Sequence, residues 1–256
     1  MFNHRTTNTL TDKITRKIRN NFNFIAHPVT YITERKQKRE MFNNLMLIRK
    51  LDEALGTNFG EGGRNGRIKQ EVLHIPKERA NDYSGTPTDI ITWLRKINVT
   101  NEDAIIDLGC GKGLAMYYMS QFPFCIIDGV ELSEQLVKDA ERNLNHLFPH
   151  DDRFHVFCHD AGTFEGYDSY SVFYIYNSFP QVVVGEVLGR IKESLQNVPR
   201  TVIVFYMNPE FPEVFMEDDT FFLVRKGTYK EKRCGMHIFT NTIMKENRFL
   251  INGGLL

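Results

Sequence analysis

From residue 87 onwards, short apolar runs alternate with longer mixed segments along the chain. The runs are apolar at consecutive positions, which is typical of strands in a parallel sheet that helices cover on both faces. We predict five such strands, at residues 104–108, 125–130, 154–159, 170–176 and 201–207. We predict helices at residues 88–97, 114–122, 133–147 and 182–195. This alternating order predicts a doubly wound α/β fold.

After Pro209 and Pro212 the pattern changes. Two further apolar segments, Phe221–Arg225 and Met236–Thr240, flank the charged connection Lys226–Arg233, which predicts an antiparallel hairpin. Five parallel strands and a closing hairpin together predict a mostly parallel, seven-stranded, Rossmann-like sheet.

The first 80 residues lack this rhythm and are predicted to form a helical N-terminal extension or lid, with the main domain at residues 81–256. Between Glu34 and Leu55 apolar residues recur at three- and four-residue steps, so we predict a helix that Gly56 ends. Four glycines follow within residues 60–66. Such a segment is either a plain linker or a mobile flap over a site, and we favour the flap.

The net charge is zero, but its distribution is uneven. Residues 1–50 carry eleven Lys and Arg residues against three Asp and Glu residues. A basic segment on an acidic body suits an anionic partner such as nucleic acid. The alternative is a solvated helical cap whose charges keep the protein soluble, so nucleic acid is a possible partner that the sequence does not favour.

Neither the cysteines nor the histidines form a pattern that indicates a disulfide framework or a metal site. The four cysteines contain no C-x-x-C pair, which suits free thiols in a reducing compartment. Four histidines between His146 and His159 match no zinc spacing, so we predict no metal. No apolar run approaches the roughly 18 residues of a membrane span. We therefore expect a cytoplasmic protein without a membrane partner.

The strongest motif is a glycine-rich turn that follows the first predicted strand. Gly109, Gly111 and Gly113 alternate with other residues, and Leu114 stands where a dinucleotide-binding G-x-G-x-x-G motif has its third glycine. Glycines let a ligand approach the backbone closely. Asp107 lies two residues before the turn and suits the ammonium group of S-adenosylmethionine (AdoMet), which has no pyrophosphate. The motif therefore predicts AdoMet as the cofactor.

Two acidic residues follow the next two predicted strands. Glu131, eighteen residues beyond Gly113, can accept hydrogen bonds from both ribose hydroxyls of a nucleoside. Asp160 can accept from the adenine amino group. We include the adjoining Leu132 and Ala161 among the cofactor-binding residues, because they follow the same strand ends.

These residues resemble the class I AdoMet-dependent methyltransferases over about residues 80–240. Within that superfamily the stretch Asp82–Pro87 is similar to the entrance loop of the non-SET histone-lysine methyltransferases and of their bacterial relatives of unknown substrate. The resemblance implies an AdoMet-dependent methyltransferase in which Tyr83 and Thr86 contact the methionine end of the cofactor, with Tyr83 also a candidate catalytic residue.

The acceptor site is predicted to lie after the fourth strand, in the sequence Tyr176–Pro180. The side-chain oxygen of Asn177 can accept from an amine and direct its lone pair at the methyl group, so Asn177 is a candidate for both catalysis and cofactor binding. This stretch resembles the Asn-Pro-Pro-aromatic motif of amino methyltransferases, but its aromatic follows Asn by two residues instead of three.

The function that we expect is in-line N-methylation of an amine-bearing small molecule or protein side chain. Three alternatives stay open at this point: O-methylation, RNA methylation, and a non-catalytic AdoMet-binding sensor or partner protein.

Overall fold

The computed structural model describes residues 28–62, 66–85, 89–228, 235–242 and 248–249. The packing of its backbone divides the chain into two compact units, residues 1–44 and 45–256. The division that we expect from sequence, at residue 80, stays a prediction. Helix α2 (Pro28–Leu55) ends at Gly56, whose positive φ of 70° suits glycine. Within the larger unit, its residues Leu45 and Ile48 are buried.

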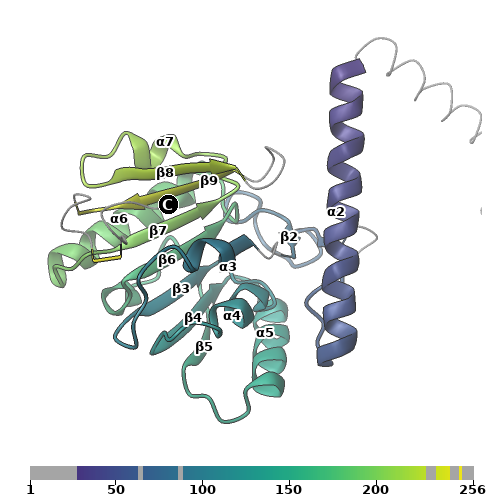
Figure 1. The fold of residues 1–256 in the computed structure, drawn as a ribbon, viewed down its shortest axis with the longest axis horizontal. Coiled ribbons are helices and arrows are strands. Elements are labelled where there is room, and N and C mark those ends of the chain that lie inside the picture. Colours follow the sequence, from purple (N-terminus) through teal and green to yellow (C-terminus); the bar gives the residue numbers. More distant parts are fainter. Residues whose placement is uncertain (1–27, 63–65, 86–88, 229–234, 243–247, 250–256) are drawn as a thin grey trace, which may run out of the picture. The chain divides into compact units, whose positions relative to one another are not determined.

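The larger unit contains a seven-stranded sheet of order β5-β4-β3-β6-β7-β9-β8 (Figure 1). The strands are β3 (Ala104–Leu108), β4 (Ile126–Glu131), β5 (Phe154–Cys158), β6 (Val172–Tyr176), β7 (Ile203–Met207), β8 (Phe222–Thr228) and β9 (Gly235–Thr240). The first five are mutually parallel, whereas β9 pairs antiparallel with both β7 and β8. This arrangement confirms the predicted fold class, a doubly wound and mostly parallel sheet.

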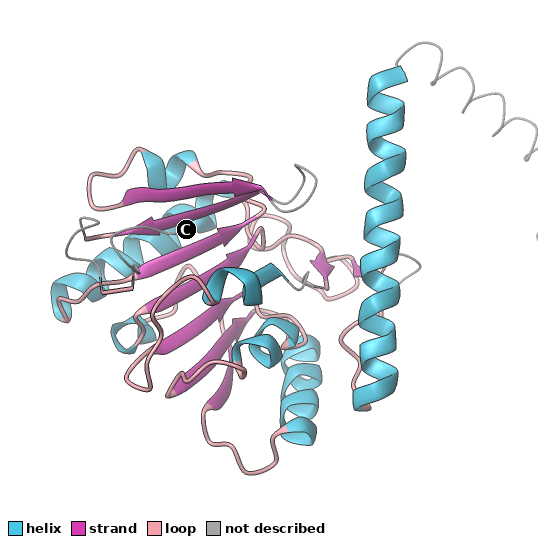
Figure 2. Ribbon diagram, viewed as in Figure 1, coloured by secondary structure: helices cyan, strands magenta, loops and turns pink. Residues whose placement is uncertain are grey.

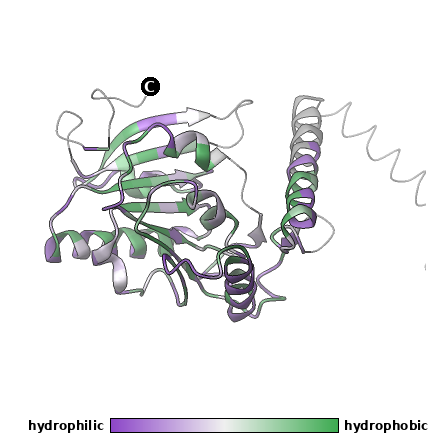
Figure 3. Ribbon diagram, turned by 60° about the horizontal axis from the view of Figure 1, so that its bottom comes forward, coloured by the Kyte–Doolittle hydropathy of each residue, from purple (hydrophilic) through white to green (hydrophobic). Residues whose placement is uncertain are grey.

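Helices cover both faces of the sheet (Figure 2). Helices α3 (Asp89–Leu94), α4 (Leu114–Met119) and α5 (Glu134–Leu147) cover one face, and α6 (Gln181–Asn197), α7 (Glu213–Met216) and the 3₁₀ turn η1 (Gly166–Ser169) cover the other. Along β3, Ile105 packs into the first layer and Ile106 into the second. The central strands β3, β6 and β7 are accordingly buried along nearly their whole length, and much of the sheet is green in Figure 3.

Two short strands lie outside the predicted pattern. Strands β1 (Arg67–Ile68) and β2 (Tyr83–Ser84) pair antiparallel, with Ile68 opposite Tyr83. Two residues are too few to produce a periodicity, so the sequence gives no signal for them. Their pairing fixes the segment that carries Tyr83.

Three of the four cysteines, Cys110, Cys125 and Cys158, are free thiols, and Cys234 lies outside the described residues. Over the stretches that the structure describes, no helix has both the length and the apolar character needed to span a membrane.

Candidate functional site

The glycine loop lies at the carboxyl end of β3, in the centre of the sheet. Its three glycines have positive φ angles of 79°, 55° and 83° at Gly109, Gly111 and Gly113, a conformation that other residues adopt at an energetic cost. The amides of Gly109 and Cys110 both donate to the carbonyl of Val130, at 2.8 and 3.1 Å. The loop therefore turns sharply over the end of β4 and brings its backbone to the sheet edge, where doubly wound folds bind ligands.

Two buried carboxylates lie beside this loop. Asp107 is 3% exposed and Glu131 is 8% exposed. Burial raises the pKa of both carboxyl groups, and the charge of Glu131 raises the pKa of Asp107 further. Glu131 accepts hydrogen bonds from the amides of Gly111 at 3.0 Å and Ser133 at 2.9 Å. A carboxylate has about four lone-pair positions. The amide of Leu132 adds a third backbone hydrogen bond to this carboxylate. Glu131 therefore keeps the capacity to accept from one hydroxyl group of a ligand.

Asn177 follows β6 directly and has two unfavourable features. Its φ angle is +41°, in the left-handed region. Its side-chain Oδ1 is buried without a hydrogen-bond partner in the described part of the chain. Strained backbone and unsatisfied buried acceptors are both rare, and they concentrate at functional sites. The backbone carbonyl of Asn177 is held by Asn81, whose Nδ2 donates to it at 2.8 Å.

The ring of Tyr83 covers Gly111 so closely that a Cβ atom at Gly111 would overlap it. The Tyr83 hydroxyl donates to the carbonyl of Phe59 at 2.8 Å. Burial raises the pKa of Tyr83 above its ordinary value, so the hydroxyl stays protonated at neutral pH. The structure thus places Tyr83 on the glycine loop. Thr86 lies outside the described residues, and the roles of both residues stay predictions.

Asp160 lies in the turn after β5, but its carboxylate is already held by protein groups. The guanidinium of Arg79 donates to both of its oxygens, and the amide of Gly162 donates to Oδ1 at 2.9 Å. Leu132 is half-buried after β4, and Ala161 is buried beside Asp160. The adenine-binding role of Asp160 stays a prediction, and only Oδ2 retains an evident lone pair for it.

Three residues that the sequence analysis did not identify join the site. Arg79 binds Asp160, Asn81 binds the backbone of Asn177, and Lys112 is buried inside the glycine loop. The partners of Arg79 and Asn81 lie 81 and 96 residues away in the chain. No local pattern could have found them, whereas the position of Lys112 between two loop glycines was a usable signal.

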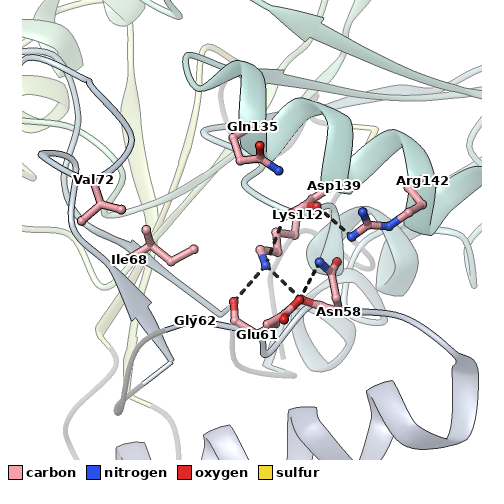
Figure 4. Close-up of a pocket in the computed structure, with 9 residues that line it drawn as sticks. All are labelled: Asn58, Glu61, Gly62, Ile68, Val72, Lys112, Gln135, Asp139 and Arg142. Carbon is pink, nitrogen blue, oxygen red and sulfur yellow. Dashed lines mark hydrogen bonds and ion pairs between the residues drawn. The ribbon is translucent and has the colours of Figure 1, made fainter.

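Lys112 connects the loop to α5 and to residues 58–61. Its ammonium group pairs with Asp139 at 3.2 Å and donates to the carbonyls of Asn58 at 3.3 Å and Glu61 at 2.9 Å. Next to these groups lies a cleft of about 550 Å³ (Figure 4). Gln135, Asp139 and Arg142 of α5 line one side of it.

Across the described residues, no three His, Cys, Asp or Glu side chains gather into a set that could hold a metal ion. His155 pairs instead with Asp128 at 3.0 Å. His159 contacts the carbonyl of Asp160 at 3.0 Å.

Comparison with solved structures finds methyltransferases at low sequence identity. An RNA methyltransferase from Salinibacter ruber in complex with S-adenosyl-L-homocysteine matches at 16% identity and a TM-score of 0.49, covering 61% of this chain and 92% of that one. A SAM-dependent methyltransferase from Aquifex aeolicus matches at 13% identity and a TM-score of 0.49, covering 61% and 94%. The resemblance to the non-SET histone-lysine methyltransferases stays a prediction.

No protein-family model matches the chain. A curated relative, a tRNA1(Val) (adenine(37)-N6)-methyltransferase from Tolumonas auensis, is 33% identical over 107 residues, which are 41% of this chain and 43% of that protein. The chain therefore spans less than half of the length of the curated relative it matches. Over that part of its sequence, this protein is similar to an enzyme that methylates an adenine amine of tRNA.

Proposed function

We propose that this protein transfers a methyl group from AdoMet to an amine nitrogen. The observation that carries the proposal is the buried Oδ1 of Asn177, which has no hydrogen-bond partner among the described residues. It lies at the sheet edge that also holds the glycine loop, Asp107 and Glu131. An amide oxygen without a partner is suited to a ligand that donates a hydrogen bond, and an amine is such a ligand.

The residues present fit AdoMet. The remaining lone-pair capacity of Glu131 suits a ribose hydroxyl, and buried Asp107 suits the ammonium group of the methionine end. Burial and the charge of Glu131 raise the pKa of Asp107, and a cationic group of a bound ligand would favour its ionised form. When bound there, AdoMet supplies a methyl group on a sulfonium centre.

The part of this chain in the reaction is alignment. Asn177 would accept one N–H of the acceptor amine and direct the nitrogen lone pair along the line of displacement. With AdoMet bound, the N–C bond would form as the C–S bond breaks, and the nitrogen would then lose its proton to solvent. Phe179 is buried in one core layer and Tyr176 packs half-buried against the other, so their rings would limit the access of water from both sides. Such alignment accounts for a large part of the rate of group-transfer reactions.

The acceptor that we propose is the exocyclic amine of adenine in RNA. The curated relative acts on that group in tRNA, and residues 1–50 carry the excess of basic residues that binding to phosphates requires. We therefore prefer nucleic acid as the methyl acceptor, whereas the sequence alone favours an amine of a small molecule or a protein. The Asn-Ser-Phe sequence after β6 is compatible with either kind of amine.

Incubation with methyl-tritiated AdoMet and separated RNA, protein and small-molecule fractions of a cell extract tests the proposal. We expect label in RNA and, after digestion to nucleosides, in N6-methyladenosine. Label in the protein or small-molecule fraction instead would show that RNA is not the acceptor, while methyl transfer itself would stand. Bound AdoMet without any transfer would contradict the proposed reaction.

In Asn177→Ala we expect turnover to fall about 100-fold while AdoMet binding is retained, because misalignment alone has a cost of this order.

A further inference from the structure

The conformation of Asn177 requires support from outside its own turn. Its left-handed backbone and its buried, unpartnered Oδ1 are both unfavourable. Such a residue persists only where neighbouring groups determine its position. The described contact within the turn itself is a hydrogen bond from Ser178 Oγ to the carbonyl of Tyr176, at 3.2 Å.

Asn81 supplies this support through two hydrogen bonds. Its side-chain Nδ2 donates to the carbonyl of Asn177 at 2.8 Å, and its backbone amide donates to the carbonyl of Ser178 at 2.9 Å. The two acceptors belong to consecutive peptide groups. Because both peptide planes are held by one residue, the backbone at Asn177 and Ser178 has little freedom to rotate.

Asn81 is itself held firmly on both sides. Two residues earlier, Arg79 binds Asp160 and Glu186 through four hydrogen bonds of 2.6–3.1 Å. Two residues later, the Tyr83 ring packs on Gly111 of the glycine loop. The segment 79–83 therefore connects the turn after β5, the turn after β6 and the loop after β3. The same segment therefore holds Asn177 through Asn81 and contacts, through Tyr83, the glycine loop that we propose binds the cofactor.

We propose that Asn81 is the positioning residue that directs the Asn177 side chain at the acceptor amine. This inference rests on the proposed methyl transfer. Asn81 acts through Asn177, so its loss lowers kcat and leaves the affinity for AdoMet unchanged. A general structural role would instead lower cofactor affinity and thermal stability together.

Two variants of Asn81 remove its side-chain hydrogen bond, and Gln70 offers a control. Asn81→Asp keeps the shape of the side chain but removes the Nδ2 donor, and Asn81→Ala removes the whole side-chain amide. Both variants keep the backbone amide that donates to Ser178. Gln70 donates a longer side-chain hydrogen bond to the neighbouring carbonyl of Ala80, at 3.4 Å. Gln70→Ala therefore perturbs the same segment but removes neither of the hydrogen bonds that Asn81 donates.

The test measures methyl transfer from tritiated AdoMet to total tRNA, AdoMet affinity by calorimetry, and crystal structures of the variants. We expect both Asn81 variants to lose kcat by about tenfold or more, with Kd for AdoMet within about twofold, and Gln70→Ala to retain kcat. In the crystal structures we expect Asn177 to leave the left-handed region in the Asn81 variants alone. Retained kcat in both Asn81 variants, or an unchanged Asn177 conformation, would overturn the inference.

The activity measurements and the crystal structures together distinguish a failure of this inference from a failure of the proposed function. If wild-type protein transfers no methyl group to tRNA while Asn177 shifts in the Asn81 variants, tRNA methylation fails and the positioning of Asn177 by Asn81 stands. If wild-type protein is active and Asn177→Ala loses turnover while the Asn81 variants do not, the positioning role fails and the proposed function stands.

Discussion

Arg79 donates hydrogen bonds to both carboxylate oxygens of Asp160, with Nε 2.6 Å from Oδ2 and Nη2 2.7 Å from Oδ1. The same guanidinium binds Glu186 on α6, with Nη2 2.7 Å from Oε2. Burial raises the pKa of Asp160, but the hydrogen bonds from Arg79 and Gly162 outweigh burial and hold it below its ordinary value. One arginine thus connects residue 79 to the turn after β5 and to the helix after β6.

Removing Arg79 should lower stability in a pH-dependent way. A carboxyl group with a depressed folded-state pKa stabilises the protein above its unfolded pKa, about 3.9, and this contribution is lost as the pH falls through the folded pKa. We expect Arg79→Gln to lose about 1–3 kcal/mol of unfolding free energy at neutral pH, since both partners are only about one-fifth exposed. Urea unfolding should show this loss shrinking as the pH falls from about 3.9 through the lower folded-state pKa of Asp160.

The exposed pair Arg190–Glu193 on α6 supplies the control, because its side chains are 33% and 61% exposed. Arg190→Gln should change stability by less than about 1 kcal/mol at any of these pH values. Equal losses in the two variants would show that the Arg79 pair has no special role.

AdoMet affinity should depend on the ionisation of Glu131. Burial raises the pKa of this carboxyl group, and ribose hydroxyls donate to its ionised form. We therefore expect the affinity to fall as the pH is lowered through the raised pKa, and to reach a plateau above it. In Glu131→Gln the affinity should be about 10- to 100-fold weaker at neutral pH, as for a lost charged hydrogen bond, with this pH dependence removed. Calorimetric titrations at a series of pH values check this, and identical pH profiles in the two proteins would contradict it.

Gly111 should tolerate no side chain. Its φ of +55° disfavours other residues, and a Cβ atom would overlap the ring of Tyr83. We expect Gly111→Ala to weaken AdoMet binding by about tenfold or more and to destabilise the fold by about 1–3 kcal/mol. Gly189 on α6 has open space around its Cα, so Gly189→Ala should be neutral or stabilising by up to about 1 kcal/mol. Thermal unfolding and AdoMet titration of both variants measure the contrast, and similar behaviour would argue against a tightly packed loop.

Lys112 and Asp139 form a buried ion pair, with side chains 3% and 8% exposed. Lys112→Met leaves the Asp139 carboxylate buried and, within the described part of the chain, paired only with the exposed Arg142. We expect a loss of about 3–5 kcal/mol, as for other buried pairs that lose one member. The double variant Lys112→Met/Asp139→Leu should recover part of this loss in urea unfolding. A single variant as stable as wild type would show that the pair contributes little.

The main domain could be predicted from the sequence because each element has a local cause. Strand β3 has the predicted bounds, since its run of apolar residues, interrupted by Asp107 alone, is buried on both faces. Helix α5 begins at Glu134, directly after its N-cap Ser133, whose Oγ accepts from the amide of Leu136 at 3.4 Å. Asp107 and Glu131 could be predicted to lie close together, because they stand near the carboxyl ends of two parallel strands and such ends meet at one edge of a sheet.

The rest of the candidate site depends on contacts between distant residues. The pairing of Arg79 with Asp160 joins a stretch without periodicity to a turn, and the two-residue strand β2 has no pattern of its own. The left-handed backbone of Asn177 is a property of the folded turn and its contact with Asn81. Sequence reasoning could nominate Asn177 and Asp160 as functional residues but could not identify the residues that hold them.

A crystal structure of the protein with AdoMet would test the central claim most directly. We expect the ribose hydroxyls on Glu131, the methionine ammonium beside Asp107, and the methyl group facing Oδ1 of Asn177 through an open acceptor channel. Cofactor bound away from the glycine loop, or a methyl group buried without access to Asn177, would contradict the proposed methyl transfer at this site.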